Sequence, residues 1–485
     1  MRKHFLLLHL IVLSVLIATA QKPTAIAATK QKAMADLQQQ YNKYKDIALS
    51  VWSYAEVGYK ETKSTALLQE TLEKSGFTIQ KGVAGLPTAF VATYGAGQPV
   101  IGLLAEFDAL PGLSQDTVTE RKPLANSIAG HACGHHLFGT ASVAAAIELK
   151  QLMESGVIKG TIKLFGCPAE EGGSGKVYMV REGLFNNVDA VVHWHPASTN
   201  ATAIGSSLAD ITVKFRFHGI AAHAAAAPDK GRSALDGVEA MDNMVNMMRE
   251  HLPQDARIHY VISNGGKAPN VVPEFAEVWY TIRHRSRTEL KRIFNWAVEA
   301  AKGAAMGTQT SVDYEILSGE YETLPNKALA IAVQKNLETV GGVKYTPAEA
   351  AFASGIQSSF GYNAPPVTAA DSIEPLLLEN INTVFYASTD VGDISWTVPT
   401  IGMGAATWAP GTPPHSWQAV ACGGTAIGFK GMMVAAKTMT LTALDLFTDK
   451  TLLQNARKEF VEARGPGFKY EAIVGDRKPP FNYRD

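Results

Sequence analysis

The chain has 485 residues, and its 44 lysines and arginines are balanced by 45 aspartates and glutamates. This balance gives no indication of a nucleic-acid partner, and we expect none. The length is too great for one simple hydrophobic core, so two domains are expected.

The first twenty residues have the organisation of a secretory signal peptide. Arg2 and Lys3 give a positive start, residues 5–17 are almost wholly apolar, and Ala18-Thr19-Ala20 is a small-residue cleavage pattern. A membrane anchor is the alternative, but the apolar run is shorter than the roughly 20 residues that span a bilayer. We therefore expect a secreted or periplasmic protein that keeps no membrane attachment after cleavage.

Residues 30–208 are expected to form the first part of a catalytic domain. Helices are predicted over 32–54, 65–75, 140–153 and 176–182, and strands over 77–83, 88–94, 100–104, 161–166 and 190–195. Helices that alternate with apolar strands are typical of an α/β fold with a mostly parallel sheet. The turns that carry candidate functional residues follow strands, as expected for a site beyond strand ends.

The pattern changes at about residue 209. Strands are predicted over 210–217, 257–262, 277–283 and 310–317, and helices over 233–251 and 288–306. The order β-α-β-β-α-β predicts a compact inserted α+β domain over residues 209–322. Residues 323–485 then return to the catalytic domain through helices from Ala328 onward and over 428–446, whereas residues 341–371 are expected to be a loop.

The densest group of candidate metal ligands is His131-Ala132-Cys133-Gly134-His135-His136. Cys133 and His135 are two residues apart, a spacing that suits a tight turn better than a helix for two converging side chains. Thiolate and imidazole together suit zinc and other divalent ions of intermediate softness. A helix cap with solvated histidines is the alternative.

Cysteine usage supports the ligand interpretation. Only Cys133, Cys167 and Cys422 are present, an odd and sparse set that does not indicate a disulfide framework. Cys133 is therefore a candidate thiolate ligand, and the other two are expected to be buried apolar side chains.

Other segments supply matching side chains. Glu170 and Glu171 follow an apolar strand, where one carboxylate can bind metal while the other takes a proton from water. His193 and His195 end another strand on a shared face, so one of them is a candidate ligand. His415 lies in a Gly/Pro-rich loop. A solvated acidic turn and ordinary core or surface histidines are the alternatives.

Three residues of the inserted domain are candidates for substrate contact. His223 could polarise a carbonyl or stabilise an oxyanion, and Arg283 could bind a carboxylate through two hydrogen bonds. Asn270 lies in the same domain. A capping or surface histidine and a surface ion pair are the alternatives.

Together these segments resemble the aminoacylase/carboxypeptidase family of dinuclear metallo-amidohydrolases. The resemblance is carried by residues 104–110, 131–140, 167–176, 194–196, 219–225, 231–236, 270–272, 387–393 and 411–417, in family order. It implies a peptidase-like catalytic domain with an inserted dimerisation (lid) domain and two divalent metal ions, zinc or manganese. It also implies hydrolysis of an N-acyl or N-aroyl amino acid with a free carboxylate, such as p-aminobenzoyl-glutamate.

The resemblance implies roles for single residues of the catalytic domain. Five of them match the metal ligands of the family: Cys133, His135, Glu171, His195 and His415. Glu170 matches the general base. The sequence departs from the family at His136, where many relatives have an Asp that usually orients a ligand.

The resemblance also implies roles in the lid. His223 matches a lid histidine that reaches the active site of the partner copy, and Asn270 and Arg283 match positions near the substrate carboxylate. A homodimer through the lid is therefore expected, with a heteromer as the alternative.

An aminoacylase or small-peptide carboxypeptidase with another acyl group is the alternative function. A non-catalytic binding protein of the same fold is a further alternative, which the presence of Glu170 opposes.

Overall fold

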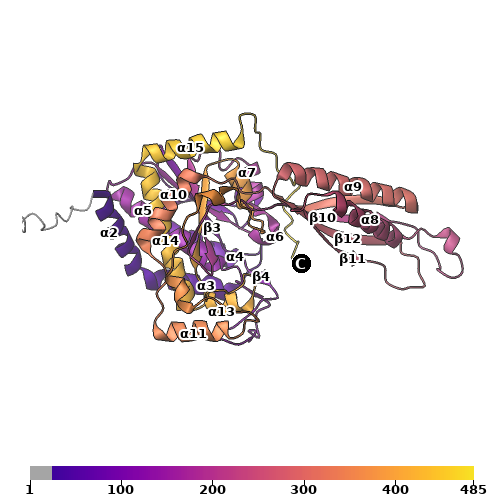
Figure 1. The fold of residues 1–485 in the computed structure, drawn as a ribbon, viewed down its shortest axis with the longest axis horizontal. Helices are drawn as coiled ribbons and strands as arrows, with labels where there is room; N and C mark the ends of the chain where they lie inside the picture. Colours follow the sequence, from indigo (N-terminus) through magenta and orange to yellow (C-terminus); the bar gives the residue numbers. More distant parts are fainter. Residues whose placement is uncertain (1–24, 485) are drawn as a thin grey trace, which may run out of the picture.

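The computed structural model describes residues 25–484 and contains a large and a small sheet with separate hydrophobic cores. The predicted signal peptide lies outside the described residues. Figure 1 shows the larger α/β part and the smaller part end to end along the long axis of the molecule. The expected fold class, α/β with a mostly parallel central sheet and a second α+β part, is confirmed.

The large sheet has the strand order β1-β2-β6-β3-β7-β14-β8, with β9 also paired to β14. Its strands are β1 (Thr78–Lys81), β2 (Phe90–Gly95), β3 (Val100–Glu106), β6 (Thr161–Cys167), β7 (Ala190–Val192), β8 (His195–Ala197), β9 (Ala201–Ala203) and β14 (Thr400–Ala406). The pairs from β6 to β8 are parallel, whereas β1, β2 and β9 run antiparallel to their neighbours. The residues that follow β3, β6 and β7 therefore meet at one edge of the sheet.

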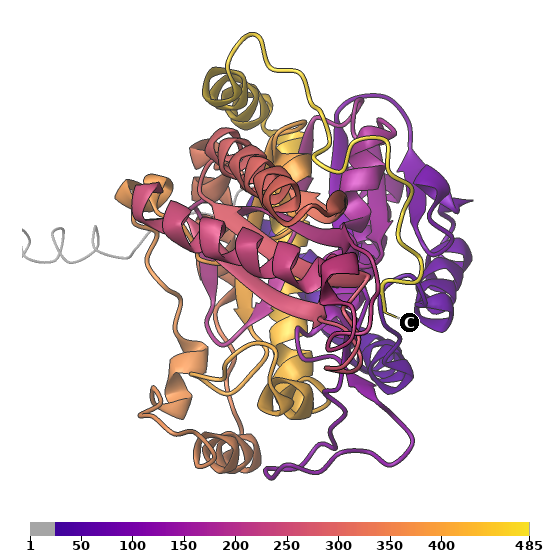
Figure 2. The ribbon, with the colours of Figure 1, turned by 90° about the vertical axis from the view of Figure 1, so that its right-hand side faces the viewer.

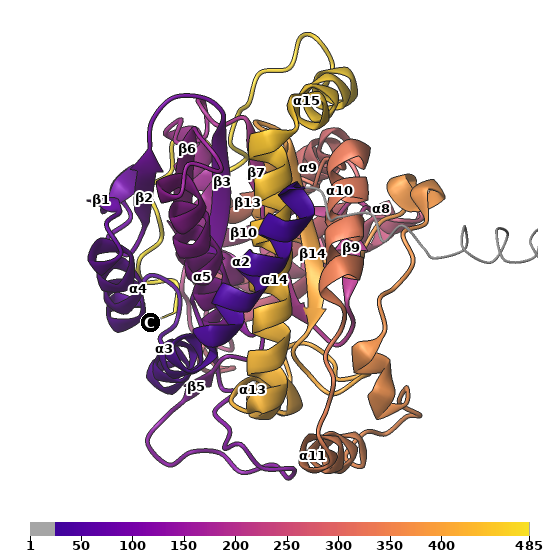
Figure 3. The same cartoon turned by 90° about the vertical axis from the view of Figure 1, so that its left-hand side faces the viewer.

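The larger part also contains twelve described helices, several of which pack against this sheet. They are α2 (Ala25–Gln39), α3 (Tyr41–Tyr54), α4 (Thr62–Lys74), α5 (His135–Glu154), α6 (Glu170–Gly173), α7 (Gly175–Arg181), α10 (Lys327–Val340), α11 (Pro347–Gln357), α12 (Val391–Ser395), α13 (Trp417–Gly423), α14 (Ala426–Thr448) and α15 (Lys450–Arg464). In Figure 3, α5 and α14 lie side by side and α2 crosses over them. Every residue of α5 from His135 to Leu149 is buried, because alanines and glycine let neighbouring elements approach it closely.

Two segments differ from the sequence-based expectation. The helix expected over 32–54 is divided into α2 and α3 at Gln40, which leaves the helical region with φ −90° and ψ 7°. Helix α11 lies inside residues 341–371, which were expected to be a loop. It begins with a complete capping box between Thr346 and Glu349 and with proline at its first turn. These helix-start residues are visible in the sequence, so the loop expectation was wrong because it overlooked this capping signal.

The small sheet is antiparallel, with the strand order β11-β12-β10-β13. Its strands are β10 (Ala209–His218), β11 (Arg257–Asn264), β12 (Phe275–His284) and β13 (Ser311–Glu320), and its helices are α8 (Ala234–Met248) and α9 (Arg287–Thr308). Alternate residues of β10 are buried, which produces the core against α8 and α9. Figure 2 shows these two helices side by side in front of the larger part.

Short elements complete the described chain. They are the ribbon of β4 (Leu110–Pro111) and β5 (Ala129–Gly130), and the 3₁₀ helices η1 (Val83–Gly85), η2 (Pro228–Lys230), η3 (Arg249–His251), η4 (Val367–Asp371) and η5 (Leu378–Asn382). No single helix among residues 25–484 is long and apolar enough to cross a membrane. Helices α13 and α14 pass that test only as a pair, but they meet at 74° and α14 is largely buried in the core.

Candidate metal centre

The five residues that match metal ligands lie together, although they come from four separate segments of the chain. Ligand atoms of Cys133, His135 and His195 all lie within 4.8 Å of one another, and so do those of Cys133, Glu171 and His415. The Cys133 Sγ is 3.3 Å from the His195 Nε2, and the His415 Nε2 is 3.2 Å from the Glu171 Oε1. Cys133 is common to both groups, so the two groups adjoin at its sulfur.

A glycine brings the first two candidate ligands to this point. Gly134 precedes α5 with φ 79° and ψ 19°, a left-handed conformation that glycine adopts without strain. A Cβ at this position would lie 2.6 Å from the Cβ of Pro196. Gly134 therefore allows the start of α5 to approach β8, which carries His195.

The loop of His415 is tied to the same turn. His415 has φ 57°, an uncommon conformation for a non-glycine residue, and its backbone N–H donates to the Ala132 carbonyl at 3.0 Å. Non-glycine residues with this conformation occur where the surrounding structure holds them in place. The side chain is 52% exposed, so the candidate centre opens to solvent on this side.

Hydrogen bonds occupy the Nδ1 atoms of His135 and His195. The Nδ1 of His135 lies 2.8 Å from Asp108 Oδ1, and the Nδ1 of His195 lies 2.8 Å from the Pro196 carbonyl. Since neither oxygen can donate, both Nδ1 atoms carry the hydrogen. With Nδ1 engaged in this way, the Nε2 of each ring is the nitrogen that remains to bind a metal ion.

The buried polar atoms of this region fit divalent cations. His135 Nε2 and Glu106 Oε2 face each other at 3.1 Å, and Glu171 Oε1 faces the His415 Nε2 at 3.2 Å, but among the described residues none of the three buried atoms has a partner with good hydrogen-bond geometry. Burial lowers the pKa of His135, but the charges of Cys133, Glu106 and Asp108 outweigh burial and raise it well above its usual range. Surroundings that stabilise a positive charge on this imidazole also favour a bound cation. Thiolate, imidazole and carboxylate are an appropriate donor set for zinc and similar ions.

Asp108, and not His136, is the residue that orients candidate ligands in this structure. Besides His135, Asp108 accepts a hydrogen bond from the Glu171 backbone N–H at 3.0 Å, so it contacts two candidate ligands. His136 is buried elsewhere: its Nε2 lies 3.0 Å from the Gly423 carbonyl, and its ring packs against His131 with 4.9 Å between centroids. His136 therefore does not contact the candidate ligands, and the carboxylate that orients two of them is Asp108, after β3.

Glu170 lies beside the ligand group. Glu106, His135 and Glu170 form a third set of side chains with ligand atoms within 4.8 Å of one another. Burial, followed by the negative charges of Glu106 and Glu171, raises the pKa of Glu170 well above its ordinary value. A half-buried carboxylate with a raised pKa has the character of a general base.

Behind Glu106 lies a buried ion cluster that sequence reasoning missed. The Lys176 Nζ is 2.6 Å from Glu106 Oε1 and 2.6 Å from Asp390 Oδ1, and none of the three side chains is more than 1% exposed. Glu106 and Asp108 could have been found as two acids at the end of a buried strand. Lys176 and Asp390 carry no such signal, because their burial is decided only in the folded chain.

His193 is not part of the ligand group. Its Nδ1 is buried without a hydrogen bond, and its ring stacks on Phe138 with 6.4 Å between centroids. Burial lowers the pKa of His193 to about 3, so it is a neutral core residue. The choice that the sequence left open between His193 and His195 therefore falls on His195.

His223 and Asn270 lie together on loops of the small-sheet part, and no described contact joins them to the candidate ligands. A β-bridge pairs His223 with Val271, and the Ala224 N–H donates to the Asn270 carbonyl at 3.0 Å. Both side chains are exposed. The Nδ1 of His223 accepts the N–H groups of residues 225 and 226 at 3.2 and 3.1 Å, so its Nε2 is the hydrogen donor.

Arg283 occupies a different place, at the junction of the two parts. It lies on β12 opposite Asp210 of β10, and its Nη1 donates to the Ser388 hydroxyl at 3.2 Å. Asp210 is buried, and its Oδ1 has no hydrogen bond among the described residues. Arg283 is thus held between the lid sheet and the segment that precedes α12.

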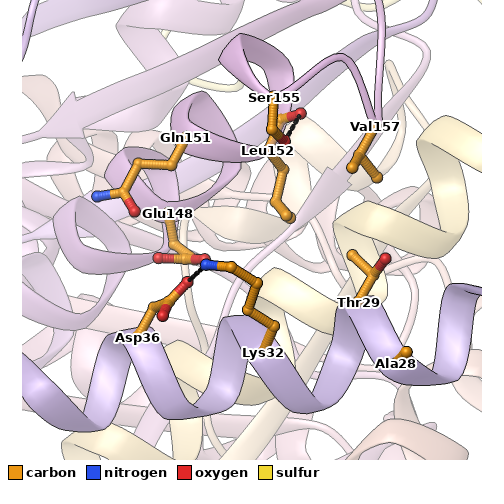
Figure 4. Close-up of a pocket in the computed structure, with 9 residues that line it drawn as sticks. All are labelled: Ala28, Thr29, Lys32, Asp36, Glu148, Gln151, Leu152, Ser155 and Val157. Atoms are coloured by element: carbon orange, nitrogen blue, oxygen red, sulfur yellow. Dashed lines mark hydrogen bonds and ion pairs between the residues drawn. The ribbon is translucent and has the colours of Figure 1, made fainter.

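A separate hollow of about 330 Å³ lies between α2 and the end of α5 (Figure 4). Lys32 and Asp36 of α2 form an ion pair there, facing Glu148 of α5. The candidate metal ligand His135 begins α5, and a helix of 20 residues is about 30 Å long. This hollow therefore does not belong to the metal centre.

Residues 102–372, more than half of the chain, match the model of peptidase family M20/M25/M40. The chain belongs to this family. It is 41% identical to one subunit of the p-aminobenzoyl-glutamate hydrolase of Escherichia coli, over 86% of this chain and 92% of that protein. It is 30% identical to the Xaa-Arg dipeptidase of Mus musculus, over 85% of this chain and 88% of that protein. These findings confirm the family resemblance and show that this M20 protein is a hydrolase of amide bonds.

Solved structures agree on the M20 fold. An aminobenzoyl-glutamate utilization protein from Klebsiella pneumoniae has a TM-score of 0.61 at 18% identity, over 85% of this chain and 97% of that chain. The YXEP protein of Bacillus subtilis, described as a dinuclear metal-binding peptidase of the M20 family, has a TM-score of 0.57 at 16% identity, over 85% and 99%. At these identities the likeness shows the fold alone.

Proposed function

We propose that this M20 hydrolase cleaves N-acyl or N-aroyl amino acids that carry a free carboxylate, with p-aminobenzoyl-glutamate as the first candidate substrate. The observation that carries the proposal is the convergence of two sets of ligand atoms on Cys133, with Glu170 beside them. The 41% identity to the Escherichia coli p-aminobenzoyl-glutamate hydrolase chain supports the substrate class. We propose that the two sets hold two divalent ions, zinc or manganese.

Each residue has a part in the proposed reaction. When bound, the ions supply the Lewis acidity that lowers the pKa of a water molecule. Glu170 takes the proton of the attacking water and returns it to the leaving amine, for which its raised pKa is suited. His223 donates its Nε2–H to the oxyanion, because its Nδ1 already accepts backbone hydrogen bonds.

Substrate orientation is the proposed role of the remaining lid residues. Arg283 offers a guanidinium group for the free carboxylate, and such groups bind carboxylates through two parallel hydrogen bonds. Among the described residues, its hydrogen bond is to Ser388, at 3.2 Å, which leaves further N–H groups for a ligand. Asn270 lies beside His223 and would bind the same substrate from the lid loops.

The proposal includes a homodimer through a lid domain of residues 209–322, with 30–208 and 323–485 as the catalytic domain. β11 is an edge strand of the small sheet, and Tyr260, Val261 and Ile262 on it are 37%, 58% and 40% exposed. An edge strand with exposed apolar side chains is a surface suited to pairing with a second copy. A partner lid would then supply His223. A heteromer is the alternative, since two different Escherichia coli relatives of this chain are both named as subunits of p-aminobenzoyl-glutamate hydrolase.

A small-peptide substrate is the second candidate, favoured by the 30% identity to an Xaa-Arg dipeptidase. The test is turnover of p-aminobenzoyl-glutamate by protein loaded with Zn²⁺ or Mn²⁺, beside Xaa-Arg dipeptides and N-acetyl amino acids. Glu170→Gln is expected to abolish turnover, whereas Glu182→Gln, an exposed neighbour, retains it. Activity on the other compounds alone would replace p-aminobenzoyl-glutamate as the candidate substrate, and no activity on any of them with metal bound would overturn the proposed substrate class.

We also propose that the protein is exported and cleaved after Ala20, on the pattern of its first twenty residues. N-terminal sequencing of the protein purified for the same assay checks this. An intact Met1 in correctly exported protein would contradict cleavage at this site.

A further inference from the structure

We propose that the segment after Gly475 is a positioning strap for the candidate metal ligand Glu171, acting through Tyr483 and Arg484. After α15 the chain runs back across the molecule as the yellow coil in Figure 2, and the strap is the last part of this coil, beside the turn that carries Glu171. This inference rests on the proposed role of Glu171 as a ligand.

The turn over residues 169–174 has a backbone that helix hydrogen bonding alone does not hold. Glu171 has φ −70° and ψ 69°, and both Ala169 and Ser174 have left-handed conformations. Buried carboxylates hold two of its backbone N–H groups: Glu61 accepts the N–H of Ala169 at 2.8 Å, and Asp108 accepts that of Glu171. Such conformations persist only where the surroundings determine them.

The strap provides the complementary donors, for the carbonyl of Glu171. The Tyr483 hydroxyl donates to this oxygen at 3.0 Å, and the Arg484 guanidinium donates to the same atom. These are the donors that the described part of the chain offers to that oxygen. With Asp108 on its N–H and the strap on its carbonyl, Glu171 is held on both sides, and its Oε1 lies in the ligand group, 3.2 Å from the His415 Nε2.

Other contacts fix the strap along its course. Arg181 of α7 donates to the carbonyls of Gly475 and Arg477 at 2.9 and 2.8 Å. Arg477 in turn donates to the Leu317 carbonyl of β13 at 2.8 Å. The strap thus contacts the catalytic part and the lid sheet before it reaches the ligand turn.

Aromatic contacts hold the end of the strap in place. The ring of Tyr59 meets Phe481 and Tyr483 edge-on at centroid distances of 5.3 and 5.8 Å, and the Tyr59 hydroxyl donates to the Gly173 carbonyl at 2.6 Å. One residue therefore touches both the strap and the ligand turn. Removing the strap donors is expected to release the peptide of Glu171, because a partly buried carbonyl would lose its partners.

The test is divalent-ion binding by the full chain, measured by competition with a chromophoric chelator for Zn²⁺. Tyr483→Phe removes one neutral hydrogen bond, and we expect its Kd to rise about fivefold. The double variant Tyr483→Phe/Arg484→Ala loses both donors, and we expect a rise of about 10- to 100-fold, as for other partners that orient metal ligands. The double variant Tyr483→Phe/Arg484→Lys keeps a donor at position 484, and we expect it to bind Zn²⁺ more tightly than Tyr483→Phe/Arg484→Ala.

Asn482→Ala is the matched control, because its exposed side chain lies between Phe481 and the two donors in sequence. Weaker binding in the double variant with an unchanged control supports the strap, whether or not the protein hydrolyses any tested amide. Unchanged binding in the double variant, or an equal loss in Asn482→Ala, overturns it. Circular dichroism identifies any variant that fails to fold, and the conservative Tyr483→Phe then decides the question.

Discussion

Replacing Lys176 with methionine tests the ion cluster behind the candidate centre. The Lys176 ammonium lies 2.6 Å from one oxygen each of Glu106 and Asp390, and the Lys176 backbone N–H donates to Asp390 at 2.9 Å. Burial lowers the pKa of Lys176, but the charges of Asp390 and Glu106 outweigh burial and raise it well above its usual range. The lysine is therefore charged, and methionine would leave two buried carboxylates without their cation.

The expected loss of folding free energy is the cost of protonating one of those carboxylates once its cation is gone. Protonating a carboxyl group of ordinary pKa about 3.9 at pH 7 costs about 4 kcal/mol, at about 1.4 kcal/mol for each pH unit. This agrees with the loss of about 3–5 kcal/mol that follows removal of one partner of a buried ion pair. At pH 5 the same protonation costs about 1.5 kcal/mol. Lys176→Met is thus expected to lose most at neutral pH and to recover much of the loss at pH 5.

Urea unfolding followed by tryptophan fluorescence, in the presence of a chelator, measures this difference. Lys74→Met is the matched control, since Lys74 forms an ion pair of the same 2.6 Å length with Glu70 on an exposed helix face. That pair is screened by water, so the control is expected to unfold like the parent protein. A Lys176→Met protein no less stable than the control, or equally destabilised at pH 7 and pH 5, would refute the reasoning.

Two further predictions concern the surface and the hollow of Figure 4. Burial, followed by the charge of Asp36, raises the pKa of Glu148 to about 7, so its contribution to stability is full below its ordinary value of 4.5 and is lost as pH rises toward 7. Glu148→Gln is accordingly expected to raise the melting temperature at pH 8 but not at pH 4; an equal gain at both would contradict the shift. Val261→Arg on β11 is expected to convert the proposed dimer to a monomer in size-exclusion chromatography with light scattering, because two arginines would face each other across the strand edges. Glu299→Arg on α9 is the control, and a dimer that survives Val261→Arg would exclude this edge as the interface.

Local sequence patterns were sufficient for most of the fold. The periodicity of β10 and the small-residue run of α5 located those elements, because the spacing of apolar residues reflects which face is buried. The same reasoning missed α11, although Thr346 and Glu349 form a capping box that is visible in the sequence. The candidate ligands near Cys133 could be named because a thiolate and imidazoles so close in sequence are uncommon without a shared purpose.

Only the tertiary structure could decide between chemically equivalent residues. His193 and His195 are indistinguishable by type and position, yet one packs on Phe138 and the other faces Cys133. Asp108 orients His135, because the end of β3 lies beside the start of α5.

Long-range partners were also beyond the sequence. Tyr483 reaches the Glu171 carbonyl across 312 positions, and Lys176 meets Asp390 across 214. Local patterns record which face of an element is buried, but not which distant segment covers it. By itself, then, the sequence determined the elements, the family and the types of ligand. The folded chain decided which side chains converge, because burial and hydrogen bonding between remote segments exist only once the chain has packed.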